Sequence, residues 1–235
     1  MCTLSWIREL DGYHVFFNRD ERRTRAPGLP PEPGERSGIE WLAPRDGESH
    51  GTWIGANRRG VTLAILNRWH ESPVANDGPW TSRGLLVRSL LDAHSIEEVA
   101  RRVESTDLQI YQPFTLTAFE TGMDVSVFAW TGRGAVRDQV SESGMVLTSS
   151  GFDQEAAMRR GALFARHPDP RPEQFEAVHA SHEPERGPLS VCMHRPEAET
   201  VSYTRIDVSP AQVVMTYVPG APGETTDRIV ATLDR

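Results

Sequence analysis

A tight-turn signal close to the start of the chain constrains its fold more than any other feature. Asp11-Gly12 favours the two-residue turn of a β-hairpin, and it separates the strand-like segments Thr3–Arg8 and Tyr13–Phe17. Because strands joined by so short a turn run antiparallel, the residues after the second strand return beside the start of the chain. The sequence therefore predicts that Cys2 lies next to the segment Asn18-Arg19-Asp20-Glu21.

Apolar periodicity predicts the other elements. One helix starts near Ser82, and another opens at Ser95-Ile96-Glu97-Glu98, which has the spacing of a capping box. Residues 24–51 are rich in proline and glycine, and we expect a long loop there. The remaining predictions are two helices, Asp153–Arg166 and Pro172–Ala180, and eight strands: Thr52–Ala56, Val61–Leu66, Phe114–Phe119, Val125–Trp130, Met145–Thr148, Leu189–His194, Val201–Asp207 and Val213–Tyr217.

The order of these elements indicates the fold class. Four strands, helices, three strands, helices and three strands follow one another, without the strand–helix–strand alternation of a parallel sheet. We therefore expect an α+β fold, with two antiparallel sheets flanked by helices, and a single domain over residues 1–235.

The charge balance limits the classes of partner. The chain has 25 Lys and Arg against 33 Asp and Glu, a net charge of −8, which argues against nucleic acid or an anionic membrane as its main partner. No apolar run approaches the roughly 18 residues of a membrane span, and the start of the chain lacks the regions of a signal peptide. We expect a cytoplasmic protein without a membrane span. The sequence does not indicate an oligomeric state.

Cys2 is a candidate nucleophile. Methionine aminopeptidase removes Met1 when a small residue such as cysteine follows, and the product carries a thiol and a free α-amine on one residue. An α-amine has a pKa near about 7.7–8.0, so at neutral pH it can act as a general base for the thiol. A cysteine at position 2 is by itself only weak support for a nucleophile.

The segment predicted to lie beside Cys2 strengthens this interpretation. Asp20 could hydrogen-bond the ammonium group, and Arg19 could favour the thiolate. Asn67, at the end of the fourth predicted strand, could donate its amide to a developing oxyanion. The alternative for these residues is a surface turn with a salt bridge and a turn-forming asparagine.

Two pairs of residues have spacings that metal sites use, but neither pair is complete. His179 and His182 stand three apart before Glu-Pro, and Cys192 and His194 stand two apart on a predicted strand. A metal site needs further ligands near such a pair. Since the sequence indicates none, we expect no metal site.

Several segments together resemble the NRDE-motif family, the family of the transport-and-Golgi-organization proteins. The resemblance is dense over residues 1–67 and sparser, but in order, beyond them. It rests on these segments: Met1-Cys2-Thr3, Asp11-Gly12-Tyr13-His14-Val15-Phe16-Phe17, Asn18-Arg19-Asp20-Glu21, His50-Gly51-Thr52-Trp53-Ile54-Gly55, Ala64-Ile65-Leu66-Asn67, Leu147-Thr148-Ser149-Ser150 and Ser190-Val191-Cys192-Met193-His194-Arg195.

The resemblance implies a fold and a set of roles. The family is similar to the N-terminal nucleophile (Ntn) hydrolases, which have a four-layer αββα sandwich, and the opening segments also resemble their bile-salt and penicillin V acylase branch. This implies Cys2 as nucleophile, Arg19 and Asp20 as its supports, and Asn67 as oxyanion donor. Ser149 or Ser150 stands where the branch has a second asparagine, and a late arginine of the branch corresponds to Arg195 or Arg205. We expect substrate contacts from Asn18, Trp53, Ser149, Ser150 and Arg195.

These residues leave three functions open. The first is a hydrolase, without a cofactor, that cleaves a small or acylated amide. The second is a non-catalytic protein on the same fold that binds or traffics haem or another hydrophobic metabolite, as the family's association with haem implies. The third is a scaffold. The carrier would use Trp41, Trp53, Trp69 and Trp80, with axial ligands from among His14, His50, His70 and His194.

Overall fold

The computed structural model describes residues 2–68, 79–142, 146–149 and 154–235. Trp69, His70 and Ser150, named above as candidate binding residues, lie outside the described residues, as do Met145 and Asp153 at the ends of predicted elements.

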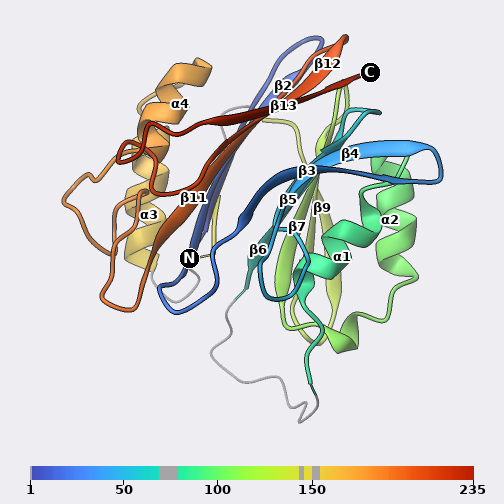
Figure 1. The fold of residues 1–235 in the computed structure, drawn as a ribbon, viewed down its shortest axis with the longest axis horizontal. Helices are drawn as coiled ribbons and strands as arrows, with labels where there is room; N and C mark the ends of the chain where they lie inside the picture. The colour runs from blue at the N-terminus through green and yellow to red at the C-terminus, as the bar shows by residue number, and fades with distance from the viewer. Residues whose placement is uncertain (1, 69–78, 143–145, 150–153) are drawn as a thin grey trace.

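The described residues form four layers (Figure 1). The helices are α1 (Arg83–Leu90), α2 (Ile96–Glu104), α3 (Gln154–Phe164) and α4 (Pro172–His179). The strands are β1 (Thr3–Arg8), β2 (Tyr13–Arg22), β3 (Leu29–Arg36), β4 (Ile39–Arg45), β5 (Ile54–Asn57), β6 (Val61–Asn67), β7 (Phe114–Glu120), β8 (Val125–Trp130), β9 (Ala135–Val140), β10 (Val146–Thr148), β11 (Ala198–Val208), β12 (Gln212–Val218) and β13 (Ile229–Asp234).

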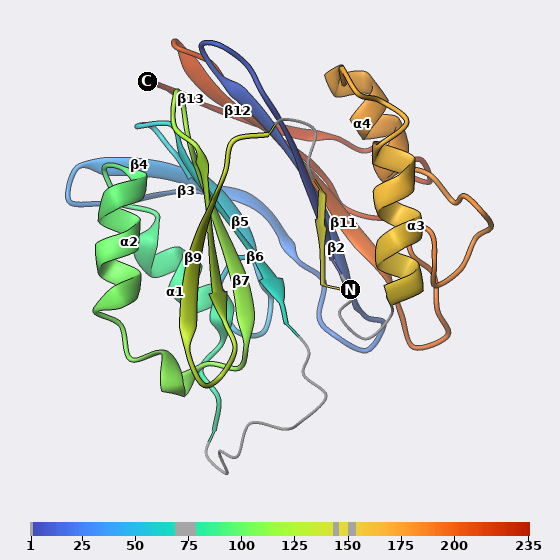
Figure 2. The same ribbon diagram turned by 180° about the vertical axis from the view of Figure 1, so that it is seen from behind.

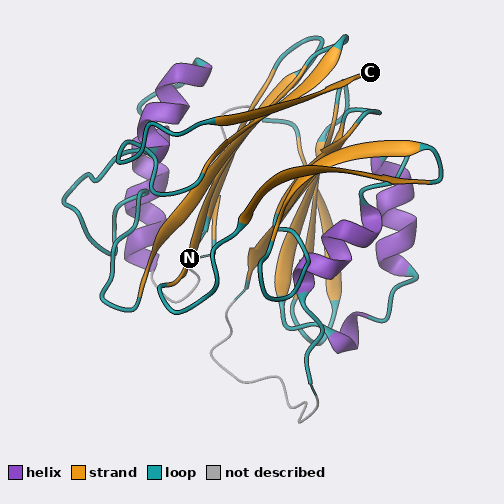
Figure 3. Ribbon diagram, viewed as in Figure 1, coloured by secondary structure: helices purple, strands orange, loops and turns teal. Residues whose placement is uncertain are grey.

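Two antiparallel sheets lie face to face in the middle (Figure 3). The six-stranded sheet has the order β10-β1-β2-β11-β12-β13, and the seven-stranded sheet runs from β3 to β9 in chain order. Helices α3 and α4 cover the outer face of the first sheet, and α1 and α2 cover the second (Figure 2). The predicted α+β architecture of two antiparallel sheets with flanking helices is confirmed. None of the described helices is both long enough and apolar enough to cross a membrane.

The predicted N-terminal hairpin is present. β1 has the predicted bounds, and Thr3 lies opposite Asn18 across the β1–β2 pair. β2 is longer than predicted because β11 pairs along its whole length, as far as Arg22, whereas the pairing with β1 ends at Asn18. The tetrapeptide that starts at Asn18 is therefore part of a central strand, not of a turn.

The long loop predicted over residues 24–51 contains a hairpin instead. β3 is an edge strand, where proline is tolerated because no neighbour needs its missing N–H. Ser37 and Gly38, both with positive φ, form the turn to β4. Gly34 lets the ring of Trp41 pack against the backbone, since a Cβ atom there would lie 2.4 Å from it. The prolines of this segment therefore belong to an edge strand rather than to a loop.

One predicted strand is wrong, and two strands were not predicted. Residues 189–194 form no strand; they belong to a loop with one isolated bridge between His194 and Glu199. β9 and β13 were missed because both are edge strands with mostly exposed side chains, so their apolar alternation is weak.

Tyr13 ties the two sheets together. Its side chain projects from β2 into the core between the sheets and is 3% exposed. The phenol oxygen lies 2.9 Å from the carbonyl oxygen of Gly60 and 2.8 Å from the hydroxyl of Thr62 on β6. Both partners belong to the second sheet, so this hydroxyl fixes how one sheet lies on the other.

We expect Tyr13→Phe to lower the free energy of unfolding by about 1–3 kcal/mol, because the buried oxygens of Gly60 and Thr62 lose a partner. Urea denaturation checks this. Tyr111→Phe is the matched control: it also removes the hydroxyl of a buried tyrosine, but one for which the described residues show no hydrogen bond. Equal destabilisation by both variants would contradict the bridging role.

Candidate active site

A cleft of about 820 Å³ opens where the first sheet meets the second. Cys2, Arg19 and Asp20 line it from the first sheet, and Trp53 and Asn67 line it from the second. The fold thus brings residues far apart in the sequence to one cavity.

Cys2 lies at the cleft with its side chain mostly covered. Its exposed fraction is 9%, and its sulfur lies 3.8 Å from the backbone carbonyl oxygen of Asp20, to which the thiol can donate. Burial raises the pKa of the Cys2 thiol, the charge of Asp20 adds to this, and Arg19 opposes it. The thiol therefore stays protonated at neutral pH unless a base removes the proton.

Arg19 is held firmly on the cleft wall. Its Nη2 atom lies 2.5 Å from Oδ2 of Asp46, and its guanidinium carbon lies 4.2 Å from the ring centroid of Trp53. Arg25 also bonds Asp46. Although burial opposes it, these bonds from Arg25, those from Ser49 and the charge of Arg19 lower the pKa of Asp46 well below its usual value. Asp46 is thus a fixed anion that holds Arg19 near Cys2.

The carboxylate of Asp20 is held by Thr200 and by Arg160, neither of which was predicted to belong to the site. Its Oδ1 atom accepts a hydrogen bond of 2.6 Å from the hydroxyl of Thr200, and its Oδ2 atom lies 3.8 Å from Nη1 of Arg160. Both side chains of the ion pair are fully buried, and Arg160 also donates to the Thr3 hydroxyl at 3.0 Å. Arg160 follows Ala156 by four residues on α3, so both lie on the buried face of the helix, and this spacing was the available signal.

Ser149 approaches Cys2 through the backbone. Its N–H donates to the carbonyl oxygen of Cys2 at 3.0 Å. Its hydroxyl is buried at the cleft and has no hydrogen-bond partner among the described residues. Arg195 lines the cleft, whereas Arg205 pairs with Glu176 and Asp207 outside it. Of the two candidates for the late arginine, the cleft contains Arg195.

Asn18 was expected to contact substrate but lies away from the cleft. Its side chain is fully buried and donates to the carbonyl oxygens of His179, at 2.9 Å, and Val191, at 3.0 Å. Successive residues of a strand face opposite sides, so Asn18 faces the helices while Arg19 faces the cleft. Asn18 therefore secures the helical layer.

Two further observations refine the candidate residues. Trp80 lines the cleft, but Trp41 packs beneath β3. Arg83 also lines the cleft and was not predicted; burial lowers its pKa to about 10, and it donates to the carbonyl oxygen of Pro113. Its position one residue after the predicted start of a helix was the available signal.

Residues 1–168 match the family described as Transport and Golgi organisation 2. The chain belongs to this family. The family resemblance seen in the sequence is therefore confirmed. No curated protein matches the chain closely in sequence.

The fold of this family member is similar to that of several solved structures. Penicillin V acylase from Agrobacterium tumefaciens is 15% identical, with a TM-score of 0.60 over 100% of this chain and 86% of that chain. The Caenorhabditis elegans ortholog of N-acylethanolamine-hydrolyzing acid amidase is 11% identical, with a TM-score of 0.61 over 87% and 92%. A cysteine-to-alanine mutant of conjugated bile acid hydrolase from Clostridium perfringens is 14% identical, with a TM-score of 0.55 over 100% and 92%. The Ntn-hydrolase-like sandwich is thus confirmed as the fold.

We expect Arg160→Met to lower the free energy of unfolding by about 3–5 kcal/mol, because it removes the fully buried cation that pairs with the buried carboxylate of Asp20. Adding Asp20→Asn should recover part of the loss. Chemical denaturation of the single and double variants measures both effects. Arg159→Met is the matched control on the same helix, since Arg159 is exposed and pairs with Glu155 one turn earlier. If both arginine variants had the same effect, the buried pair would not be the cause.

Proposed function

We propose that this protein is an amidohydrolase that uses Cys2 as an N-terminal nucleophile after Met1 is removed. The observation that carries the proposal is the position of the Cys2 thiol at a cleft of about 820 Å³, beside Arg19 and across from Asn67. The similar solved structures, whose titles name an acylase, an acid amidase and a hydrolase, support a small or acylated amide as the substrate class.

The free α-amine of Cys2 supplies the base that the buried thiol lacks. It accepts the thiol proton as the sulfur attacks the amide carbonyl carbon, so a C–S bond forms and the carbonyl oxygen becomes an anion. The side-chain amide of Asn67 donates to this oxyanion, and the Ser149 hydroxyl, which has no partner among the described residues, can donate a second bond. The ammonium group then protonates the amide nitrogen as the C–N bond breaks, which releases the amine and leaves a thioester on Cys2. Water hydrolyses this thioester, which releases the carboxylic acid and restores the thiol.

The charged neighbours act on the nucleophile through its protonation. The guanidinium of Arg19 stabilises the thiolate, and its pairing with Asp46 and stacking on Trp53 keep it in place. Asp20, fixed by Thr200 and Arg160, lies where it can balance the charge of the α-ammonium. Burial of this site makes each of these interactions stronger than in water.

The alternative of a haem or hydrophobic-metabolite carrier draws less support from the cleft. Trp53 and Trp80 line it, but the guanidinium of Arg19 lies over Trp53, and Trp41 lies elsewhere. Much of the lining is charged, including Arg19, Arg25, Asp46 and Arg83. A hydrolase makes use of the cysteine among these charges, whereas a carrier gives it no role.

We expect the protein from cells with normal methionine aminopeptidase to lack Met1 and to react rapidly with iodoacetamide at Cys2 at neutral pH. Intact mass before and after alkylation measures both. The processed protein should hydrolyse at least one class among penicillin V, conjugated bile acids and N-acylethanolamines, and Cys2→Ala should abolish this turnover with the fold intact by circular dichroism.

A second variant separates the amine from the thiol. Inserting a leucine between Met1 and Cys2 blocks removal of the methionine, so the cysteine remains but its α-amine is in a peptide bond. The proposal requires that this variant also lose turnover. Full activity in either variant would refute the mechanism, and a processed Cys2 that neither alkylates nor turns over any of the three amides would favour the carrier.

We expect Asn67→Ala to lower kcat for a turned-over amide by about 10²–10³, because an oxyanion donor is lost. The rate of Cys2 alkylation should stay unchanged, since that reaction forms no oxyanion. Steady-state kinetics and alkylation rates of the same preparation test this pair of expectations. An unchanged kcat would exclude Asn67 as an oxyanion donor.

A further inference from the structure

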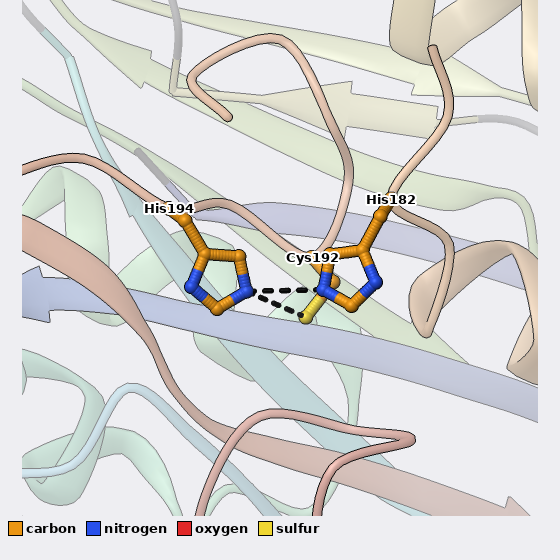
Figure 4. A group of neighbouring side chains, drawn as sticks. All are labelled: His182, Cys192 and His194. Atoms are coloured by element: carbon orange, nitrogen blue, oxygen red, sulfur yellow. Dashed lines mark hydrogen bonds between the residues drawn. The ribbon is translucent and has the colours of Figure 1, made fainter. Parts of the chain in front are cut away.

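Four side chains converge outside the cleft, between the loop that precedes β11 and the turn that follows β12. Figure 4 shows His182 and His194 with their rings facing one another and the sulfur of Cys192 beside them. The carboxylate of Glu224 reaches the same point from the turn after β12. Cys192 is fully buried and His194 is 8% exposed, whereas the side chains of His182 and Glu224 are 31% and 33% exposed, so this cluster reaches from the interior to the surface.

The distances place three ligand atoms around one point, with a fourth near two of them. The ligand atoms of His182, Cys192 and His194 all lie within 4.8 Å of one another, and the carboxylate of Glu224, which is near both histidine nitrogens, would complete the set by turning toward the sulfur. His182 Nε2 and His194 Nε2 lie 3.0 Å apart, and Cys192 Sγ lies 3.8 Å from His194 Nε2. Glu224 Oε1 lies 3.3 Å from the first nitrogen and 3.4 Å from the second. A tetrahedral zinc ion with bonds of about 2.0–2.1 Å to nitrogen and about 2.3 Å to sulfur holds its nitrogen ligands about 3.3 Å apart, and nitrogen and sulfur about 3.5 Å apart.

Hydrogen bonds account for only part of this convergence. The Cys192 thiol has another acceptor, the carbonyl oxygen of Pro222 at 3.8 Å. His194 Nε2 lies within 4 Å of His182 Nε2, Cys192 Sγ and Glu224 Oε1, yet an imidazole nitrogen carries at most one proton. That proton can serve one of the three neighbours. A cation at the centre serves all four atoms at once, since each offers it a lone pair.

We propose that His182, Cys192, His194 and Glu224 form a zinc site. Two imidazoles, a thiolate and a carboxylate are the ligand types that zinc takes, and four protein ligands make the site closed and structural. The thiolate and carboxylate neutralise the ion. Other charged groups also face the site: Arg186 pairs with Glu224 at 2.9 Å and lies 3.4 Å from His194 Nδ1, and Glu199 lies 3.8 Å from that same atom.

The position of the cluster gives the ion a structural task. Residues 180–197 connect α4 to β11 with no helix or strand, and the site would join this loop to the turn that holds Glu224. The same loop reaches the cleft: the N–H of Met193 donates to the hydroxyl of Thr200, which in turn bonds Asp20. Zinc would therefore fix one wall of the cleft without taking part in chemistry there.

The first test is on the wild-type protein. Purified with zinc present, it should hold one zinc ion per chain by plasma mass spectrometry. After chelation, titration with CoCl₂ should give the intense d–d bands of a tetrahedral site and a thiolate-to-cobalt charge-transfer band. Chelation should also lower Tm, and ZnCl₂ should restore it. Wild-type protein with substoichiometric zinc and no tetrahedral cobalt spectrum would overturn the proposal.

Variants then assign the ligands. Cys192→Ser should remove the charge-transfer band, and His182→Ala should weaken zinc binding at least about 100-fold, beyond the 10–100-fold typical of outer-shell changes. Cys2→Ser is the matched control, because it removes the other cysteine and should leave the cobalt spectrum unchanged. A charge-transfer band that survives Cys192→Ser but disappears in Cys2→Ser would overturn the assignment. If Cys192→Ser does not fold, Glu224→Gln, at a partly exposed position, tests the same site.

Discussion

The antiparallel pairing of β1 with β2 is the constraint on which the site depends. It sets Thr3 opposite Asn18, so the start of the chain lies in a central position of the six-stranded sheet rather than at its edge. On the other side β1 pairs with β10, and the N–H of Ser149 bonds the carbonyl oxygen of Cys2. Backbone pairing on both sides, more than side-chain contacts, therefore fixes where the thiol lies.

The alternation of β2 divides its residues between two tasks. Asn18 faces the helices and bonds two carbonyl groups there, whereas Arg19 faces the cleft and pairs with Asp46. Asp20 has contacts on both faces of the sheet, because a register shift in β11, between Thr200 and Ser202, lies opposite it. Its carboxylate bonds Thr200 and pairs with Arg160, while its carbonyl oxygen faces the Cys2 thiol. One short segment thus couples the position of Cys2 to the packing of the helical layer.

Local sequence patterns correctly predicted those features that depend on neighbouring residues alone. Asp11-Gly12 predicted the hairpin, and Ser95 caps α2 by accepting a hydrogen bond from the N–H of Glu98. The capping box is only half formed, because the Glu98 carboxylate accepts from the N–H of His94 instead. Prolines in β3 were misleading because the tolerance for proline depends on whether a strand lies at an edge, which is a property of the whole sheet.

Residues that act through long-range contacts could not be predicted in this way. Arg160 lies four residues after Ala156 on the buried face of α3, but its partner Asp20 lies far away in the chain, so the sequence did not indicate the pair. The spacing of Cys192 and His194 suits a metal site, but the sequence indicates no further ligand near this pair. His182 and Glu224 approach it only because the loop before β11 folds against the turn after β12.

The fold places the two cysteines in different chemical environments. Burial raises the pKa of Cys192 to about 12, and its neighbours are imidazoles, so it is poorly placed to attack a substrate. Cys2 also has a raised pKa, but it borders a cleft large enough for a ligand and lies near the guanidinium of Arg19. In the proposed mechanism Cys2 still needs a base, and removal of Met1 would supply it. The proposed role of Cys2 therefore depends on processing of the chain, whereas the proposed role of Cys192 depends on the ligands that the fold brings to it.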